Sequence, residues 1–298
     1  KQMKSMVTIM ILLLMRKLIK FTKKLKMKKT FLTLSILAIL FHSCEKEILN
    51  TSTQASQDHL FAENIFNDIN RVVEDGFNDN GLSKSSCANY TSMAADSSGT
   101  DTLIIDFGEE DCLDEYGKER RGKIIVIYTA AYQDSLSVIT TTFDHYYVNS
   151  SNWVQGNRTI TNLGRNSDGN MVFDVAIDAN ITTENGRIDW ISNRTRFWTD
   201  GRNTTQNPFD DIYKVVGTAS GNGLNNRDFT VEIKDTLEVN LGCLKPTVTY
   251  NKRCAIVSGK VEITPDEYSA REIDYGMGGC NCDFSVTIDG KSYFVVVP

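Results

Sequence analysis

The chain has 298 residues, of which 41% are hydrophobic and 23% are charged, an ordinary balance for a globular protein with a sizeable core. Its four prolines exclude a collagen-like or Pro-rich disordered chain. Residues 1–43 contain 10 Lys and Arg and no Asp or Glu, so residues 44–298 contain 22 basic and 38 acidic side chains, a formal charge of −16. A body this acidic is repelled by phosphate backbones, which argues against nucleic acid as a partner.

Residues 27–43 have the order of a bacterial export signal. Two lysines follow Met27, residues 31–41 form an apolar run, and Ser43 then precedes Cys44. The apolar run is too short to span a bilayer, which needs about 20 residues. The Ser43-Cys44 end resembles the lipobox of bacterial lipoproteins, and this resemblance implies that Cys44 is acylated and becomes the first residue of the mature chain. The alternative is an ordinary cleaved signal with a chance cysteine.

The segments on either side of this signal are not expected to belong to the fold. Residues 1–26 contain an apolar run at 6–15 and then a basic run. We interpret them as an upstream extension, because Met27 alone begins a complete signal; a second membrane segment is the alternative. After Cys44, the charged residues 45–47 resemble the tether of lipoproteins from Bacteroidetes, and residues 44–57 are predicted to be a polar tether.

Residues 58–82 are predicted to contain one amphipathic helix. Apolar residues recur at spacings of three and four between Asp58 and Phe77, which places them on one helical face. Ser56 or Asp58 is the expected cap at its start. Asp75-Gly76 and the Asn-Gly pair at 80–81 are expected to end it.

Residues 83–298 are predicted to be β-rich. Runs rich in Val, Ile, Thr, Tyr and Phe recur between turn signals, at 123–130, 137–148, 157–162, 171–177, 187–192, 194–198, 229–234, 237–241, 247–250, 260–264, 283–288 and 292–297. Asp168-Gly169, Asn185-Gly186 and Asp289-Gly290 are expected hairpin turns. The glycine-rich segment 217–223 lacks the ending of a phosphate-binding loop and is expected to be a hairpin loop. The sequence therefore predicts a mainly β fold, as an antiparallel sandwich, a barrel or a long curved sheet, with one N-terminal amphipathic helix.

Two segments, 87–128 and 254–296, share a set of landmarks. Asp106, Cys112 and Gly122 recur 168 positions later as Asp274, Cys280 and Gly290, and Cys87 recurs 167 positions later as Cys254. We interpret this register as an internal duplication. The alternative is convergent strand–turn–strand chemistry.

The cysteines are expected to form disulfides. Seven are present, and setting Cys44 aside leaves six, an even number that favours bridges in an exported chain. The matched positions favour Cys87–Cys112 and Cys254–Cys280, which leaves Cys243 with Cys282. Free buried thiols and a metal site are the alternatives, although one intervening residue between Cys280 and Cys282 is fewer than common zinc knuckles have.

The extended pattern resembles a group of uncharacterised lipoproteins from Bacteroidetes. The resemblance rests on IDFG…C…RRGKIIVIY at 105–128, on segments 143–166 and 194–198, and on IDYGMGGC followed by DGK near the end. It covers most of residues 87–298. The group has no established activity, so it implies envelope localisation and β character and transfers no catalytic residue.

Few residues stand out as chemically active. No nucleophile elbow, zinc-protease helix or phosphate-binding loop occurs, and His145 lies in a predicted strand. Glu109, Glu110 and Asp111 form an oxygen-rich cluster that is a candidate Ca²⁺ site. The matching positions 277–279 are not acidic, which favours a solvated acidic turn, and no other cofactor is expected.

Strand parity identifies one candidate ligand-binding surface. Arg194, Arg196 and Trp198 fall on one face of their strand and would offer charge and a stacking ring to a ligand. We therefore expect a lipid-anchored cell-envelope module, at the periplasmic or surface face of the outer membrane, that binds a glycan or a protein partner rather than catalysing a reaction. An envelope glycan or peptide hydrolase that uses carboxylates, and a purely structural lipoprotein, are the alternatives.

Overall fold

The computed structural model describes residues 51–78, 87–94, 99–114, 117–204, 207–245, 254–280 and 284–295. These residues belong to one compact unit, Asn50–Pro298. The predicted extension, export signal, Cys44 and most of the tether lie outside the described residues. So do the predicted strand at 247–250 and Cys282.

The described residues of this unit form one open antiparallel sheet of 14 strands with a single long helix, α2 (Gln54–Asn78). The strands are β1 (Asn89–Met93), β2 (Asp101–Asp106), β3 (Cys112–Leu113), β4 (Glu119–Tyr128), β5 (Val138–Val148), β6 (Asn152–Arg165), β7 (Met171–Thr183), β8 (Gly186–Asp200), β9 (Ile212–Asn222), β10 (Asp228–Asn240), β11 (Ile256–Pro265), β12 (Arg271–Met277), β13 (Phe284–Ile288) and β14 (Lys291–Val295). They pair in chain order, except that β3 lies beside β4 and off the main path. The mainly β prediction is confirmed, and the long curved sheet is the architecture found.

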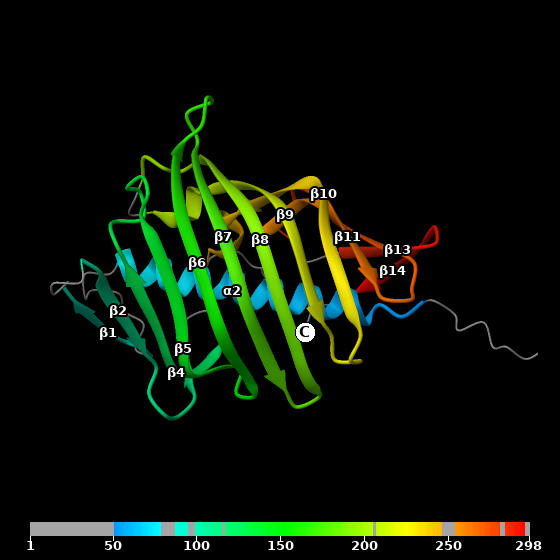
Figure 1. Cartoon of the computed structure of the whole chain (residues 1–298), viewed down its shortest axis with the longest axis horizontal. Coiled ribbons are helices and arrows are strands. Elements are labelled where there is room, and N and C mark those ends of the chain that lie inside the picture. Colours follow the sequence, from blue (N-terminus) through cyan, green and yellow to red (C-terminus); the bar gives the residue numbers. More distant parts are fainter. Residues whose placement is uncertain are drawn as a thin grey trace, which may run out of the picture. The chain divides into compact units, whose positions relative to one another are not determined.

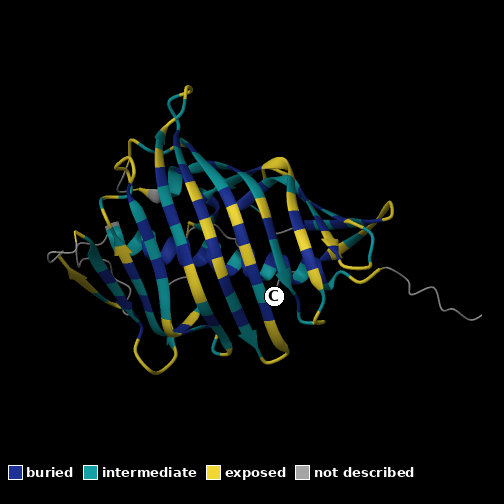
Figure 2. Ribbon diagram, in the orientation of Figure 1, coloured by how far each residue is buried: buried dark blue, intermediate teal, exposed yellow. Residues whose placement is uncertain are grey.

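The sheet curves around α2, which crosses the strands on the buried side (Figure 1). The helix contacts β2, β8 and β11, strands that lie far apart in the sheet order, so the sheet must bend to reach it with all three. Residues alternate between the two faces of each strand, as β7 shows: Val175 and Ile177 are buried, whereas Asp174 and Asp178 are exposed. Figure 2 shows this alternation as bands across the central strands. The core therefore lies between α2 and one face of the sheet.

Several predicted strands are longer in the structure. The segments 187–192 and 194–198 join into β8, and 229–234 and 237–241 join into β10. The expected hairpin loop at 217–223 is wrong, because most of it belongs to β9. Its glycines instead allow close backbone approach: a Cβ on Gly217 would lie 2.2 Å from the backbone oxygen of Asn193 in β8.

The helix begins earlier than the sequence indicates. Gln54 is its first residue, so Ser56 and Asp58 lie inside the helix and are buried, and neither caps it. The apolar periodicity starts only at Leu60, and the first turn is polar. That turn is instead held by tertiary contacts, because the carboxylate of Asp58 accepts a hydrogen bond from the backbone of Leu224 at 3.1 Å.

One predicted disulfide is confirmed, and the other two predicted pairings are wrong. Cys87 is bonded to Cys112, as expected, but Cys243 is bonded to Cys280. Cys254 is also disulfide-bonded, so the predicted Cys254–Cys280 and Cys243–Cys282 pairs are replaced. The reason is topological, since the end of β10 lies opposite the start of β11, which lies opposite the end of β12. Cys243 and Cys280 follow those two ends and meet there.

The two Asp-x-Gly landmarks of the predicted duplication have the same local structure. The Asp106 side chain accepts a hydrogen bond from the Gly108 backbone at 2.9 Å, and Asp274 accepts one from Gly276 at the same distance. Both glycines have positive φ, at 83° and 91°. The disulfides do not follow this correspondence, and the duplication remains a prediction.

Candidate functional site

The contact between α2 and the sheet is unusually polar. Four arginines point from the buried face of the sheet toward the helix: one from β4, one from β6 and two from β8. Each meets a polar helix residue: Arg120 meets Asp68, Arg158 meets Asn70, Arg194 meets Glu63 and Arg196 meets Glu74. Buried charges are stable only when they are paired and hydrogen-bonded, so the three contacts with carboxylates fix the position of the helix on the sheet. The fourth arginine, Arg158, meets a neutral side chain.

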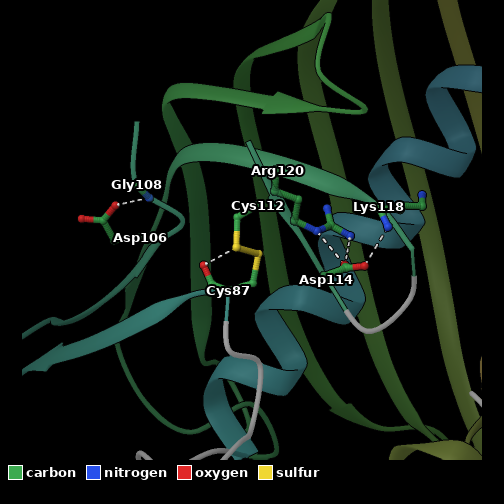
Figure 3. Close-up of a disulfide and its surroundings, with 7 residues drawn as sticks. All are labelled: Cys87, Asp106, Gly108, Cys112, Asp114, Lys118 and Arg120. Atoms are coloured by element: carbon green, nitrogen blue, oxygen red, sulfur yellow. Dashed lines mark hydrogen bonds and ion pairs between the residues drawn. A yellow bond between two sulfur atoms is a disulfide. The ribbon is translucent and has the colours of Figure 1, made fainter. Parts of the chain in front are cut away.

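Arg120 is the centre of a closed network and is fully buried. Its guanidinium lies 2.8 Å from a carboxylate oxygen of Asp68 and 2.9 Å from one of Asp114, and it donates to the hydroxyl of Tyr146 at 2.6 Å. Burial opposes ionisation of Asp68, but the charges of Arg120 and Lys118 outweigh it and hold the pKa of Asp68 well below its usual range. Figure 3 shows this arginine beside the Cys87–Cys112 bridge. Asp68, Asp114 and Tyr146 all contact Arg120 directly, so we interpret this network as structural.

A second polar region, which we call the amide pocket, lies where the start of α2 meets three hairpin turns. The turns β5–β6, β7–β8 and β9–β10 are alternate hairpins of one antiparallel sheet, so all three lie at the same edge. The pocket has a volume of about 500 Å³. It is lined by Gln54, Gln57, Asp58, Phe61, Asn149, Asn152, Thr183, Asn185, Ile188, Leu224 and Asn225.

The wall of the amide pocket is built around Asp58. Its carboxylate accepts a hydrogen bond from the Gln54 amide at 2.8 Å and another from the backbone of Leu224 at 3.1 Å. Burial raises the pKa of Asp58, and these two hydrogen bonds partly offset the rise. Gly223 follows β9 without a side chain, and a Cβ there would lie 2.3 Å from a carboxylate oxygen of Asp58. The helix start and the β9–β10 turn are thereby locked together.

The chemistry of the amide pocket favours an uncharged polar ligand. Six of its lining residues carry side-chain amides, which offer both donors and acceptors. Phe61 and Ile188 add apolar surface. Of the described residues that line the pocket, none is Lys or Arg and Asp58 is the only carboxylate.

The predicted ligand surface of Arg194, Arg196 and Trp198 lies elsewhere. The parity prediction is confirmed, because the three side chains point to the same face of β8. That face is the buried one, however, so they do not form the exposed surface that the sequence suggested. Trp198 is 4% exposed and donates to the carboxylate of Asp211 at 3.0 Å, whereas the two arginines lie under α2 with Arg158.

The remaining candidates are on the surface. Glu109, Glu110 and Asp111 are exposed, and Asp111 forms an ion pair with Arg121 at 2.7 Å. Within the part of the chain that the structure describes, no three His, Cys, Asp or Glu side chains converge to hold a metal ion, so the Ca²⁺ hypothesis finds no ready ligand set there. His145 lies 2.7 Å from Asp144 with its side chain 83% exposed, outside both polar regions.

Sequence reasoning missed the amide pocket for a clear reason. Asn149, Asn152, Asn185 and Asn225 stand in or beside turns, where asparagine is common for conformational reasons alone. Only the folded sheet brings these turns to one edge.

Comparison with known proteins adds no assignment. No protein-family model, no curated protein and no solved structure matches this chain. No helix among the described residues is both long and apolar enough to cross a membrane. The two described disulfides are typical of proteins that fold in an oxidising, extracytoplasmic compartment.

Proposed function

We propose that this protein is a cell-envelope lipoprotein, anchored to the outer membrane through Cys44, that binds a neutral glycan in the amide pocket. The Ser43-Cys44 motif and the disulfides support the location. The single observation that carries the ligand class is the composition of the pocket. Sugar hydroxyl groups donate and accept hydrogen bonds, and so do the six amides that line it.

The geometry favours binding over hydrolysis. Glycoside hydrolysis ordinarily uses two carboxylates placed on either side of the bond that breaks. Asp58 is the one carboxylate among the described residues that line the pocket, and it is engaged by Gln54 and Leu224. A half-buried aromatic ring, Phe61, offers a face on which a sugar ring can stack.

Binding is tested on an array of neutral hexose oligosaccharides, with uronic-acid oligosaccharides as the charged comparison. We expect neutral glycans to bind and the double substitution Gln54→Ala with Asn225→Ala to weaken binding roughly tenfold, since each lost hydrogen bond costs about 0.5–1.5 kcal/mol. Asn193→Ala is the matched control, because Asn193 is an exposed asparagine on β8 that does not line the pocket. Equal binding by the double variant and the control would refute the site, and an array without any neutral ligand would refute the ligand class.

The anchor is tested separately in cells. Labelling with an alkyne-bearing fatty acid is expected to mark the protein and to be abolished by Cys44→Ala, which also releases the protein from the membrane fraction. Labelling that persists in the Cys44→Ala variant would refute the anchor without affecting the pocket.

A further inference from the structure

A cavity under the middle of α2 is lined by three arginines, and one of them has no direct carboxylate partner among the described residues. We call it the arginine cavity, because Arg158, Arg194 and Arg196 line it together with Glu63. Its volume is about 80 Å³. The arginines come from β6 and β8, and Glu63 comes from α2.

Two of the three guanidinium groups have carboxylate partners. Arg194 lies 3.2 Å from Glu63, and Arg196 lies 3.1 Å from Glu74. Arg158 is 3% exposed and hydrogen-bonds the side-chain oxygen of Asn70, which is neutral. Among the described residues it forms no ion pair, and its Nη1 has no hydrogen-bond acceptor. Among the described residues, Arg158 is therefore the one guanidinium of the three without a direct carboxylate partner.

Burial dominates the electrostatics of Arg158. Burial and the neighbouring charge of Arg196 lower the pKa of Arg158 to about 10, although the carboxylate of Glu74 acts in the opposite direction. Its guanidinium is still charged at neutral pH. An isolated buried charge is costly, and an anion beside it offsets part of that cost.

The remaining wall of the arginine cavity is apolar. It includes Val175, Ile177, Val215, Leu237, Leu241 and Ile256. The guanidinium fork matches the planar oxygens of a carboxylate. One guanidinium without a carboxylate partner suits a monoanion better than a phosphate dianion, because Glu63 repels a double negative charge more strongly than a single one. The apolar wall suits a short hydrocarbon chain.

We propose that the arginine cavity binds the carboxylate of a short-chain aliphatic acid, with the guanidinium of Arg158 as the main anion contact. This site is distinct from the amide pocket and does not depend on it, since no residue lines both.

The test measures thermal unfolding and calorimetric binding of the full chain in a non-ionic detergent at neutral pH. The probes are acetate, butyrate and hexanoate, with hexanol as the uncharged comparison and inorganic phosphate as the competing anion. We expect the unfolding midpoint to rise with the carboxylates, most with the longer chains that fit, and not with hexanol. Absence of any carboxylate effect, or a phosphate effect as large as that of hexanoate, would overturn the proposal.

Two substitutions separate binding from structure. Arg158→Met removes a buried charge that has no direct carboxylate partner, so we expect an unfolding midpoint no lower than that of the parent without ligand, together with roughly tenfold or greater loss of carboxylate affinity. Arg158→Lys keeps the charge but loses the fork and is expected to bind with intermediate affinity. Arg165→Met is the control, because Arg165 is exposed on the same strand. If Arg158→Met and Arg165→Met bind carboxylates equally well, Arg158 is not the anion contact. Because the amide pocket is probed with neutral glycans, failure here leaves that proposal intact.

Discussion

Replacing Arg120 by methionine should show how strongly the polar interface holds α2 on the sheet. The substitution removes three contacts at once, to Asp68, Asp114 and Tyr146, and leaves two buried carboxylates short of a partner. Breaking a buried ion pair on one side costs about 3–5 kcal/mol. Lys118 and Arg71 remain near Asp68, so the lower part of that range is expected.

The measurement is equilibrium unfolding in urea followed by circular dichroism, with a thermal scan beside it. For a unit of this size, a loss of about 3–5 kcal/mol corresponds to a fall of about 6–20 °C in the unfolding midpoint. Arg187→Met is the matched control, because Arg187 forms an exposed ion pair with Asp189 and is expected to cost about 1 kcal/mol or less. A double-mutant cycle with Asp68→Leu then isolates the coupling between the two side chains.

A loss for Arg120→Met no greater than that for the control would refute the reasoning. It would mean that the apolar residues of α2, such as Ile65 and Ile69, hold the helix without the ion pairs. A coupling energy near zero in the cycle would lead to the same conclusion, since the two side chains lie 2.8 Å apart in the structure.

Two further predictions concern the disulfides and the dependence of stability on pH. Substituting both Cys87 and Cys112 by alanine removes a disulfide between residues 25 positions apart, and we expect the free energy of unfolding to fall by about 3 kcal/mol. The same urea midpoint for the variant and for the oxidised parent would contradict this. Burial lowers the pKa of His59 to about 4, and Nδ1 of its ring accepts a hydrogen bond from Trp190 at 3.3 Å. The folded state therefore holds the imidazole neutral. In the unfolded chain, the same ring binds a proton below its ordinary pKa of 6.5. Its contribution is therefore present above pH 6.5 and is lost as the pH falls toward 4, by about 1.4 kcal/mol per pH unit. Burial raises the pKa of Asp211 to about 7, so its contribution to the free energy of unfolding changes with pH in the opposite direction between pH 7 and pH 4. The measured quantity is therefore the difference in free energy of unfolding between the parent and His59→Gln, from urea titrations across that range. Parallel pH profiles would show that His59 is not the titrating group.

Local pattern predicted most of the β structure of this protein. The alternation of apolar and polar residues in β7 and the dipeptides Asp168-Gly169 and Asp289-Gly290 specify strands and turns within a few residues of chain. The same period-two rule placed Arg194, Arg196 and Trp198 on one face of β8. Strand alternation and turn dipeptides depend only on residues that are neighbours in the sequence, so a short window of sequence is enough to predict them.

The local sequence does not determine which face of β8 is buried. Arginine pairs are ordinarily solvent-exposed, so parity alone pointed to a surface, whereas the structure covers Arg194 and Arg196 with α2. Glu63 and Glu74 make this burial possible, but they lie more than 120 residues earlier in the sequence than their partners. No window of sequence contains both members of a pair.

The sequence by itself therefore determined the strand content and the helix, because those depend on neighbouring residues and composition. Tertiary structure decided the curvature of the sheet, the pairing of Cys243 with Cys280 and the positions of both cavities. The physical reason is that a sheet of 14 antiparallel strands brings alternate turns to one edge and distant strands around one helix. The amides of three turns and the charges of β6 and β8 acquire their neighbours only when that sheet curves around α2.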